Sequence, residues 1–138
     1  EVIHRHPDTV IVVTTNNNYA GCRDMNQSVI SRMNLIIDME DPDTYTLAER
    51  AMKVTGCTDK TTVTDMAETL RDINERCRET MVNDGSCGVR ELISWVQSYM
   101  VCGSILDSAK YTVLSSVSSD PDNRADILSS CLEQKYAA

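Results

Sequence analysis

The chain has 138 residues, enough for one domain with a buried core, and its 41% hydrophobic and 25% charged residues are typical of a soluble globular protein. Its formal net charge of −8, from 13 Lys and Arg against 21 Asp and Glu, argues against non-specific nucleic-acid binding, which needs clustered cations. No secretory signal is recognised, and no apolar run approaches the ~18–20 residues of a membrane span, so a cytoplasmic location is expected.

Two short apolar runs in the first part of the chain predict strands. Residues 9–15 read TVIVVTT, a nearly continuous β-branched run that ends at the cluster Asn16–Asn18. Because both faces of this run are apolar, it predicts a strand buried on both sides, as in a parallel sheet covered by helices. A short helical stretch is expected over Asp24–Met33, and a second short strand over Leu35–Ile37. Partner strands are hard to find in the rest of the chain, which indicates that it is part of something larger.

Five helices are predicted after residue 40, each with one apolar face at helical spacing. The first is expected to start at Asp41-Pro42, with Asp as the cap and Pro in the first helical position, and to end at Gly56. The second opens with a capping-box-like Thr62-x-x-Asp65. This second helix is expected over 62–82, the third over 88–101 and the fourth over 105–117. Asp120-Pro121 is expected to cap the fifth and last helix.

These helices should pack into a small bundle, because each has only one apolar face. With 4% aromatic residues and no Phe, the core must come from aliphatic side chains, Met and Ala. The only Trp, Trp95, is placed i+3 from Leu92, and the sequence leaves open whether it lies in the core or at an interface. The longest predicted helix carries the apolar stripe Val63, Met66, Ala67, Leu70, Ile73, Cys77 and Met81.

Neither the cysteines nor the helix acids have the pattern of a metal site. No pair among the six cysteines has C-x-x-C spacing, and only two His are present, so reduced and packed thiols are expected. A disulfide-bonded secreted helical domain stays open as an alternative. A solvated helix face, rather than a metal site, is the interpretation of the acids Glu68, Asp72, Glu75 and Glu79.

Two stretches near the start of the chain carry a recognisable pattern: HPDTVIVVTTN at 6–16 and YAGCRDMNQSVISRM at 19–33. They resemble the dynein/midasin and MoxR-like branches of the AAA+ ATPases. In those families, the strand that ends in the sensor 1 residue has the pattern H-P-x-F-x-hydrophobic-x-A-T-x-N-P. The segment that follows it has the pattern Y-x-G-x-R-x-L-x-x-A-L-x-x-R-F. Further along, Asp41-Pro42, Thr55-Gly56 and GVRELISW at 88–95 match the order and spacing of the family's helical lid and sensor 2 helix. The resemblance covers nearly the whole chain.

The chain also departs from the family pattern. Asn17 stands where the family has Pro, and Met33 stands where it has Phe. None of the five glycines is followed by Lys-Ser or Lys-Thr, so the phosphate-binding P-loop is absent from this chain. The segment Leu35–Glu40 superficially reads as a Walker B strand, but it follows the sensor 1 stretch instead of preceding it, and Met39 separates its acids. The chain is therefore interpreted as part of an ATPase module that does not hydrolyse ATP alone.

The resemblance implies catalytic roles for Asn16 and Arg32. As the sensor 1 residue, Asn16 would place an amide near the attacking water. Without the resemblance, the simpler interpretation is that Asn16 starts a turn. Arg32 would be the arginine finger that reaches the ATP of a neighbouring subunit, with Arg23 as a second candidate for that interface. The alternative is an ordinary surface arginine, which the C-terminal end of a helix favours.

Arg90 is the candidate residue for binding the nucleotide. It is expected in the first turn of a helix, where the positive end of the helix dipole disfavours a cation. As the sensor 2 residue, it would meet the γ-phosphate when the lid closes over ATP. The alternative is an ion pair with Glu91 or another surface acid.

The expected fold is mainly α, with residues 1–40 as a remnant of an α/β nucleotide-binding subdomain that keeps one or two strands, and 41–138 as a helical-bundle lid. The resemblance implies ATP and Mg²⁺ as cofactors of the parent protein, with none bound to this chain alone. It also implies a ring of subunits with chaperone-like remodelling activity and a von Willebrand A-type partner protein. No nucleic acid or membrane is expected as a partner, and the unpaired strand predicts self-association. The alternative function is a non-catalytic, acidic helical protein-interaction module, which the missing P-loop favours.

Overall fold

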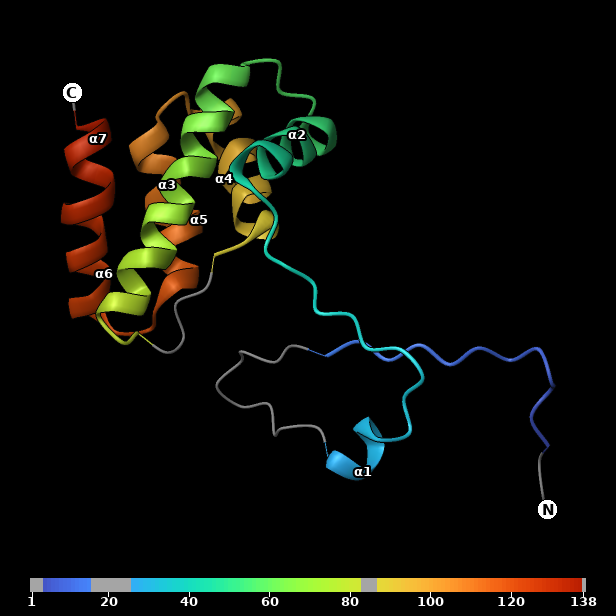
Figure 1. Cartoon of the computed structure of the whole chain (residues 1–138). Coiled ribbons are helices and arrows are strands. Elements are labelled where there is room, and N and C mark those ends of the chain that lie inside the picture. Colours follow the sequence, from blue (N-terminus) through green and yellow to red (C-terminus); the bar gives the residue numbers. More distant parts are fainter. Residues whose placement is uncertain (1–3, 16–25, 83–86, 138) are drawn as a thin grey trace. The chain divides into compact units, whose positions relative to one another are not determined.

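The computed structural model describes residues 4–15, 26–82 and 87–137, and it divides the chain into the units Glu1–Ile36 and Ile37–Ala138. In the first unit, the described residues form one short helix, α1 (Gln27–Ile30), which Asn26 caps through its side chain. This helix is shorter than the predicted helical stretch. The second unit is a bundle of helices (Figure 1). The described part of the chain is thus mainly helical, as the sequence predicts.

The longest helix of the bundle, α3 (Lys60–Glu79), packs against three other elements. The first four helices of the bundle are α2 (Thr44–Thr55), α3, α4 (Val89–Cys102) and α5 (Ile105–Val117). The last helical stretch continues without a break through α6 (Pro121–Ile127), the π-helical η1 (Leu128–Glu133) and α7 (Gln134–Tyr136). The helix α3 packs against α2, α4 and η1, while α4 packs against α2 and α5 (Figure 1). The position of α3 lets its polar side chains hold several other elements in place.

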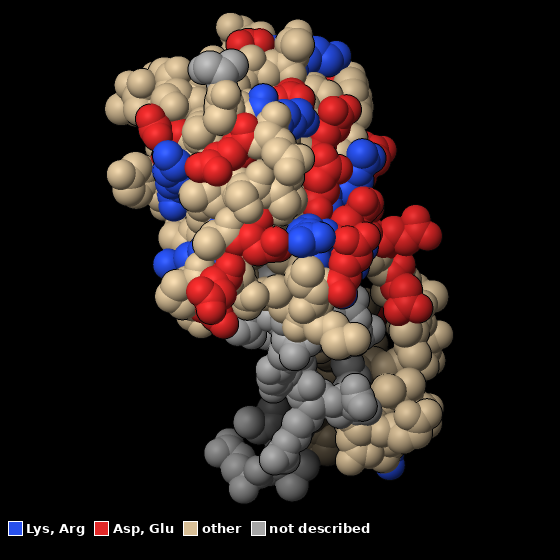
Figure 2. Space-filling view, turned by 90° about the vertical axis from the view of Figure 1, so that its left-hand side faces the viewer, with Lys and Arg blue, Asp and Glu red and all other residues tan. Residues whose placement is uncertain are grey.

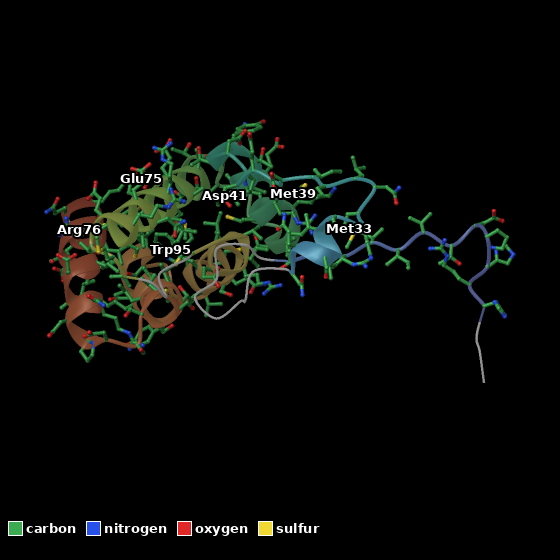
Figure 3. The ribbon with its side chains drawn as sticks, turned by 60° about the horizontal axis from the view of Figure 1, so that its bottom comes forward. Met33, Met39, Asp41, Glu75, Arg76 and Trp95 are labelled. Carbon is green, nitrogen blue, oxygen red and sulfur yellow. The ribbon has the colours of Figure 1, made fainter. Side chains whose placement is uncertain are left out.

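The core of the bundle consists of aliphatic, Met and Cys side chains together with Trp95, whose side chain is completely buried (Figure 3). The indole Nε1 donates a hydrogen bond to the carbonyl oxygen of Ile105 over 2.9 Å, which joins α4 to the start of α5. The rings of Trp95 and Tyr136 are nearly perpendicular, with an interplanar angle of 86° and their centroids 6.1 Å apart. Trp95 is therefore a core residue rather than an interface anchor. Other large and fully buried side chains are Met66, Leu70, Ile73, Leu92, Ile127 and Leu132.

Gly56 ends α2 as predicted, and Gly103 ends α4 in the same way, but two of the predicted helix starts were wrong. Gly56 and Gly103 adopt the left-handed conformation, with φ of 75° and 74°, that a C-terminal cap commonly requires. The cap of α2 is Asp43 rather than Asp41, because the Asp43 carboxylate accepts a hydrogen bond from the amide of Thr46 over 2.7 Å. The predicted first helical residue, Pro42, consequently lies before the cap.

The start and end of α3 also differ from the prediction. Asp59 caps this helix by accepting a hydrogen bond from the amide of Thr62 over 3.1 Å, so the expected box of Thr62 and Asp65 does not form the helix start. The helix ends at Glu79, and Met81 lies beyond it with a φ of 55° and an exposed side chain. The other six residues of the predicted apolar stripe are buried, as expected.

The two predicted strands are not formed, and none of the described residues lies in a strand. Residues 9–15 are exposed, with 83% of Val10 and 54% of Val13 accessible to solvent, and Leu35–Ile37 are exposed as well. A strand needs a neighbour for its backbone N–H and C=O groups, and the described residues supply none. The β-branched composition of a single run therefore does not produce a strand here. The Walker-B-like acids Asp38 and Glu40 are likewise exposed.

Candidate functional site

The residues predicted to form the site fall in different parts of the chain. Asn16 and Arg23 lie outside the described residues. Arg32 follows α1 in the first unit, where its exposed guanidinium donates a hydrogen bond to the carbonyl oxygen of Ser28. Arg90 belongs to the second unit. The structure therefore describes the two arginines separately, each within its own unit.

Arg90 is the second residue of α4 and is exposed. The predicted alternative, an ion pair with Glu91, is not formed. Instead, the Glu91 carboxylate turns back and accepts a hydrogen bond from the amide of Gly88 over 2.8 Å. Glu91 is favourable at this end of the helix, where backbone N–H groups lack partners, whereas Arg90 is not. Within the described ranges, the Arg90 guanidinium has no acid within ion-pair distance.

A side chain from α3 holds the segment that leads into α4. The Nδ2 of Asn74 donates to the carbonyl oxygen of Cys87 over 2.8 Å, and its Oδ1 accepts from the amide of Cys87, also over 2.8 Å. Cys87 itself is 4% exposed and comes directly before the cap of α4. This contact is not among those predicted from the sequence. The available signal was weak: an Asn inside a long helix is a poor helix former and often has another use.

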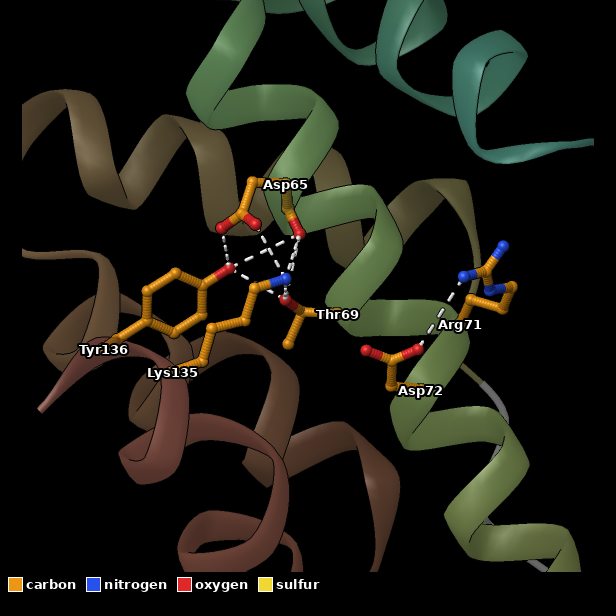
Figure 4. A network of polar contacts seen from close by, with 6 residues as sticks. All are labelled: Asp65, Thr69, Arg71, Asp72, Lys135 and Tyr136. Atoms are coloured by element: carbon orange, nitrogen blue, oxygen red, sulfur yellow. Dashed lines mark hydrogen bonds and ion pairs between the residues drawn. The ribbon is translucent and has the colours of Figure 1, made fainter.

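A second polar network joins the end of the chain to α3 (Figure 4). The Tyr136 hydroxyl donates to the Asp65 carboxylate, and the Lys135 ammonium lies 2.7 Å from the other oxygen of that carboxylate. The hydroxyl oxygen of Thr69 lies 2.8 Å from that of Tyr136. Burial and the hydrogen bond to Asp65 raise the pKa of Tyr136 well above its ordinary value of 10.0. Every member has a partner, so the network serves as a structural attachment for α7.

A third contact from α3 reaches α6. The Nε and Nη2 atoms of Arg76 each donate to one carboxylate oxygen of Asp126, both over 2.9 Å (Figure 3 labels Arg76). This two-point geometry matches a planar guanidinium to a planar carboxylate. The hydrogen bonds and the charge of Arg76 hold the pKa of Asp126 below its ordinary value of 3.8.

The pKa of Asp126 predicts a specific pH dependence. Because the folded-state pKa is lower than the unfolded-state pKa, the ion pair stabilises the fold above about pH 4 and loses that effect as the pH falls further. Asp126→Asn should therefore cause a modest loss of stability near neutral pH and little loss near about pH 2. Urea unfolding of the wild type and the variant, from about pH 2 to neutral pH, measures this difference in stability. Asp122→Asn, on the same helix, removes the same charge but leaves the Arg76 contact in place; if both variants give the same pH profile, the assignment is wrong.

All described cysteines are free thiols, some buried and some exposed. Cys22 lies outside the described residues. Burial, aided by the nearby Glu91, raises the pKa of Cys87 to about 12, so this thiol stays protonated and unreactive. Burial also raises the pKa of Cys77 and of Cys131. The free thiols are Cys57, Cys77, Cys87, Cys102 and Cys131.

The surface of the bundle is acidic. Figure 2 shows one face on which acidic side chains outnumber the basic ones and lie among them. The four acids of α3 that were expected to face solvent are all exposed, and Figure 3 labels one of them, Glu75. Within the described ranges, no His, Cys, Asp or Glu residues are grouped so that they could hold a metal ion. None of the described helices has the length and apolar character needed to cross a membrane.

Comparison with known proteins adds no relative to this description. No protein-family model, no curated protein and no solved structure matches the chain. The geometry of the candidate site is that of an exposed Arg90, with no acid paired to it among the described residues, at a helix start that a neighbouring helix holds in place.

Proposed function

We propose that the chain is the C-terminal part of an AAA+ ATPase module of the MoxR-like or dynein-related branch, with the helical bundle as its lid. The observation that carries the proposal is the exposed guanidinium of Arg90 in the first turn of α4, with no acid paired to it in the described part of the chain. A helix start disfavours a cation, and residues that break a local rule without compensation are enriched at functional sites. A γ-phosphate that meets the lid on closure would supply the missing negative charge.

The exposed apolar run at residues 9–15 supports the same proposal. Four consecutive large apolar side chains, Val10 to Val13, are open to solvent in this structure. In an intact α/β subdomain, the run would pair with neighbouring strands and bury these side chains under helices. Asn16 would then stand at the carboxyl end of a strand, where open α/β sheets place their ligands.

The proposed chemistry is charge stabilisation by residues from two subunits. Asn16 would orient the attacking water, Arg32 would reach the ATP of the neighbouring subunit, and Arg90 would contact the γ-phosphate from the lid. The exposed guanidinium of Arg90, which has no acidic partner among the described residues, fits an anionic phosphate group. ATP and Mg²⁺ would be held mainly by P-loop and Walker B residues, which this chain does not contain, so the chain alone would be inactive.

The proposal includes self-assembly. Hydrolysis would need a ring, because Arg32 serves a neighbouring subunit, and the ring would perform chaperone-like remodelling. By analogy with the family, a von Willebrand A-type protein would be a partner. The exposed run at residues 9–15 would also make the isolated chain prone to dimerise by strand pairing.

A non-catalytic interaction module is the second candidate. The acidic side chains on the face of the bundle in Figure 2 favour it, because they would suit a basic partner protein. The four acids of α3 are exposed and would add to such a surface. This function requires neither Arg90 nor the apolar run at residues 9–15. Measurement of ATP hydrolysis therefore separates the two candidates.

The test uses the product of the complete reading frame that contains this chain. We expect a G-x-x-x-x-G-K-[ST] loop upstream of residue 1, and ATP hydrolysis that Arg90→Ala lowers about tenfold. The isolated chain should not hydrolyse ATP. Arg50→Ala, which removes an exposed arginine from α2, should leave hydrolysis unchanged. A product without such a loop and without ATP hydrolysis would overturn the proposal and leave the interaction module.

A further inference from the structure

We propose that Asn74 is a positioning residue that fixes the place of Arg90 relative to the bound nucleotide. This inference rests on the function proposed above and adds a residue that the family resemblance does not supply. Asn74 does not contact nucleotide in the proposal. It acts through the backbone that leads into α4.

The contact between Asn74 and Cys87 resembles the pairing of two backbone strands. One side-chain amide satisfies both the N–H and the C=O of a single residue, each over 2.8 Å. An amide can do this because it carries a donor and an acceptor side by side, whereas a carboxylate carries only acceptors. Since Cys87 is nearly completely buried, losing either hydrogen bond would leave a buried backbone group without its partner.

The contact lies within one helical turn of Arg90. Cys87 is followed by the cap residue Gly88, whose amide is held by Glu91, and Arg90 comes two residues after the cap. The start of α4 is therefore held by hydrogen bonds from α3 to Cys87 and by the hydrogen bond between Gly88 and Glu91. While these hydrogen bonds are formed, the backbone of Arg90 cannot shift far. This restraint matters because a misplacement of about 1 Å can cost as much as 100-fold in rate.

The other polar contacts of α3 lead elsewhere. Arg76 binds Asp126 on α6, and Asp65 binds Lys135 and Tyr136 on α7. Of these three attachments, only that of Asn74 reaches the start of α4. A variant of Arg76 therefore provides a control that loosens α3 from a neighbour without touching the segment that carries Arg90.

The test is a double-mutant cycle on ATP hydrolysis by the intact protein. Asn74→Asp keeps the size of the side chain and removes the donor to the Cys87 carbonyl. We expect kcat to fall about fivefold with an unchanged KM for ATP, a loss no larger than that of Arg90→Ala. In the Arg90→Ala background, Asn74→Asp should have no further effect on kcat. Arg76→Gln should change kcat little in either background.

Hydrogen exchange and a second variant keep the test decisive if Asn74→Asp folds poorly. The Cys87 amide should be protected in the wild type and lose protection in Asn74→Asp, but not in Arg76→Gln. Asn74→Gln, which keeps both groups of the amide, should retain more activity than Asn74→Asp. If Arg90→Ala lowers hydrolysis but Asn74→Asp does not, or lowers it equally in both backgrounds, the positioning role is wrong. If Arg90→Ala itself has no effect, the proposed nucleotide role of Arg90 fails instead.

Discussion

Arg32→Ala in the intact protein is expected to lower ATP hydrolysis by about 1,000-fold, the lower end of what an arginine finger contributes to phosphoryl transfer. The guanidinium would stabilise charge that develops on the γ-phosphate of a neighbouring subunit. In the structure the side chain is exposed, and its only hydrogen bond within the described residues is to the nearby carbonyl of Ser28. Its removal should therefore leave the fold intact and change the rate of hydrolysis alone. Steady-state hydrolysis, with gel filtration to confirm assembly, measures the effect.

Mixed rings show whether Arg32 acts on a neighbouring subunit. A variant that lacks the P-loop lysine and the Arg32→Ala variant should each be inactive alone. Mixed together, they should regain part of the activity, because some interfaces combine an intact P-loop with an intact arginine. Arg5→Ala, which removes another exposed arginine of the first unit, serves as the control. No recovery on mixing, or an equal loss in the control, would contradict the role of Arg32.

The helices could be predicted from the sequence because their signals are local. The spacing of apolar residues on α3, α4 and α5 identifies the buried faces, and Gly56 and Gly103 mark helix ends through their freedom to adopt a positive φ. The exact starts were harder to predict. Asp41 and Asp43 both qualify as caps by residue type, and only the three-dimensional path of the chain decides which carboxylate meets a free amide.

The strands could not be predicted with the same reliability. A helix satisfies its backbone groups within its own segment, whereas a strand depends on a neighbour elsewhere in the sequence. The run at residues 9–15 has a strongly β-favouring composition, and it is nevertheless exposed and unpaired in the described structure. The composition of the run shows that its side chains are suited to burial in a sheet. It does not show whether a neighbouring strand is present to pair with it.

Part of the candidate site could be predicted for the same reason. The position of Arg90 in the first turn of a helix follows from the residues around it, and its conflict with the helix dipole depends only on that position, whereas its nucleotide role stays a prediction. Asn74 could not, because its partner Cys87 is 13 residues away and the contact uses only backbone atoms of that partner. Residues that act on the backbone of another element leave almost no pattern in a single sequence.

Trp95→Ala is expected to destabilise the bundle by about 3–5 kcal/mol, a large share of the 5–15 kcal/mol that typically separates folded and unfolded states. Trp95 is the largest of the completely buried side chains and lies on α4, which packs against α2, α3 and α5. Its removal opens a cavity, breaks the hydrogen bond to Ile105, and removes the edge contact with Tyr136. For a bundle of this size, the thermal midpoint should fall by about 15 °C or more.

Trp95→Phe separates packing from hydrogen bonding. It keeps most of the apolar contact and removes only the indole donor, and the Ile105 carbonyl still accepts a hydrogen bond from the Ser108 hydroxyl over 2.9 Å. We therefore expect a smaller loss, about 1–2 kcal/mol. Urea unfolding followed by far-UV circular dichroism suits all variants, because it does not depend on the fluorescence of the only Trp. Tyr111→Ala, at an exposed aromatic residue of α5, should stay close to the wild type. Equal losses in Trp95→Ala and Tyr111→Ala would mean that the core is not centred on Trp95.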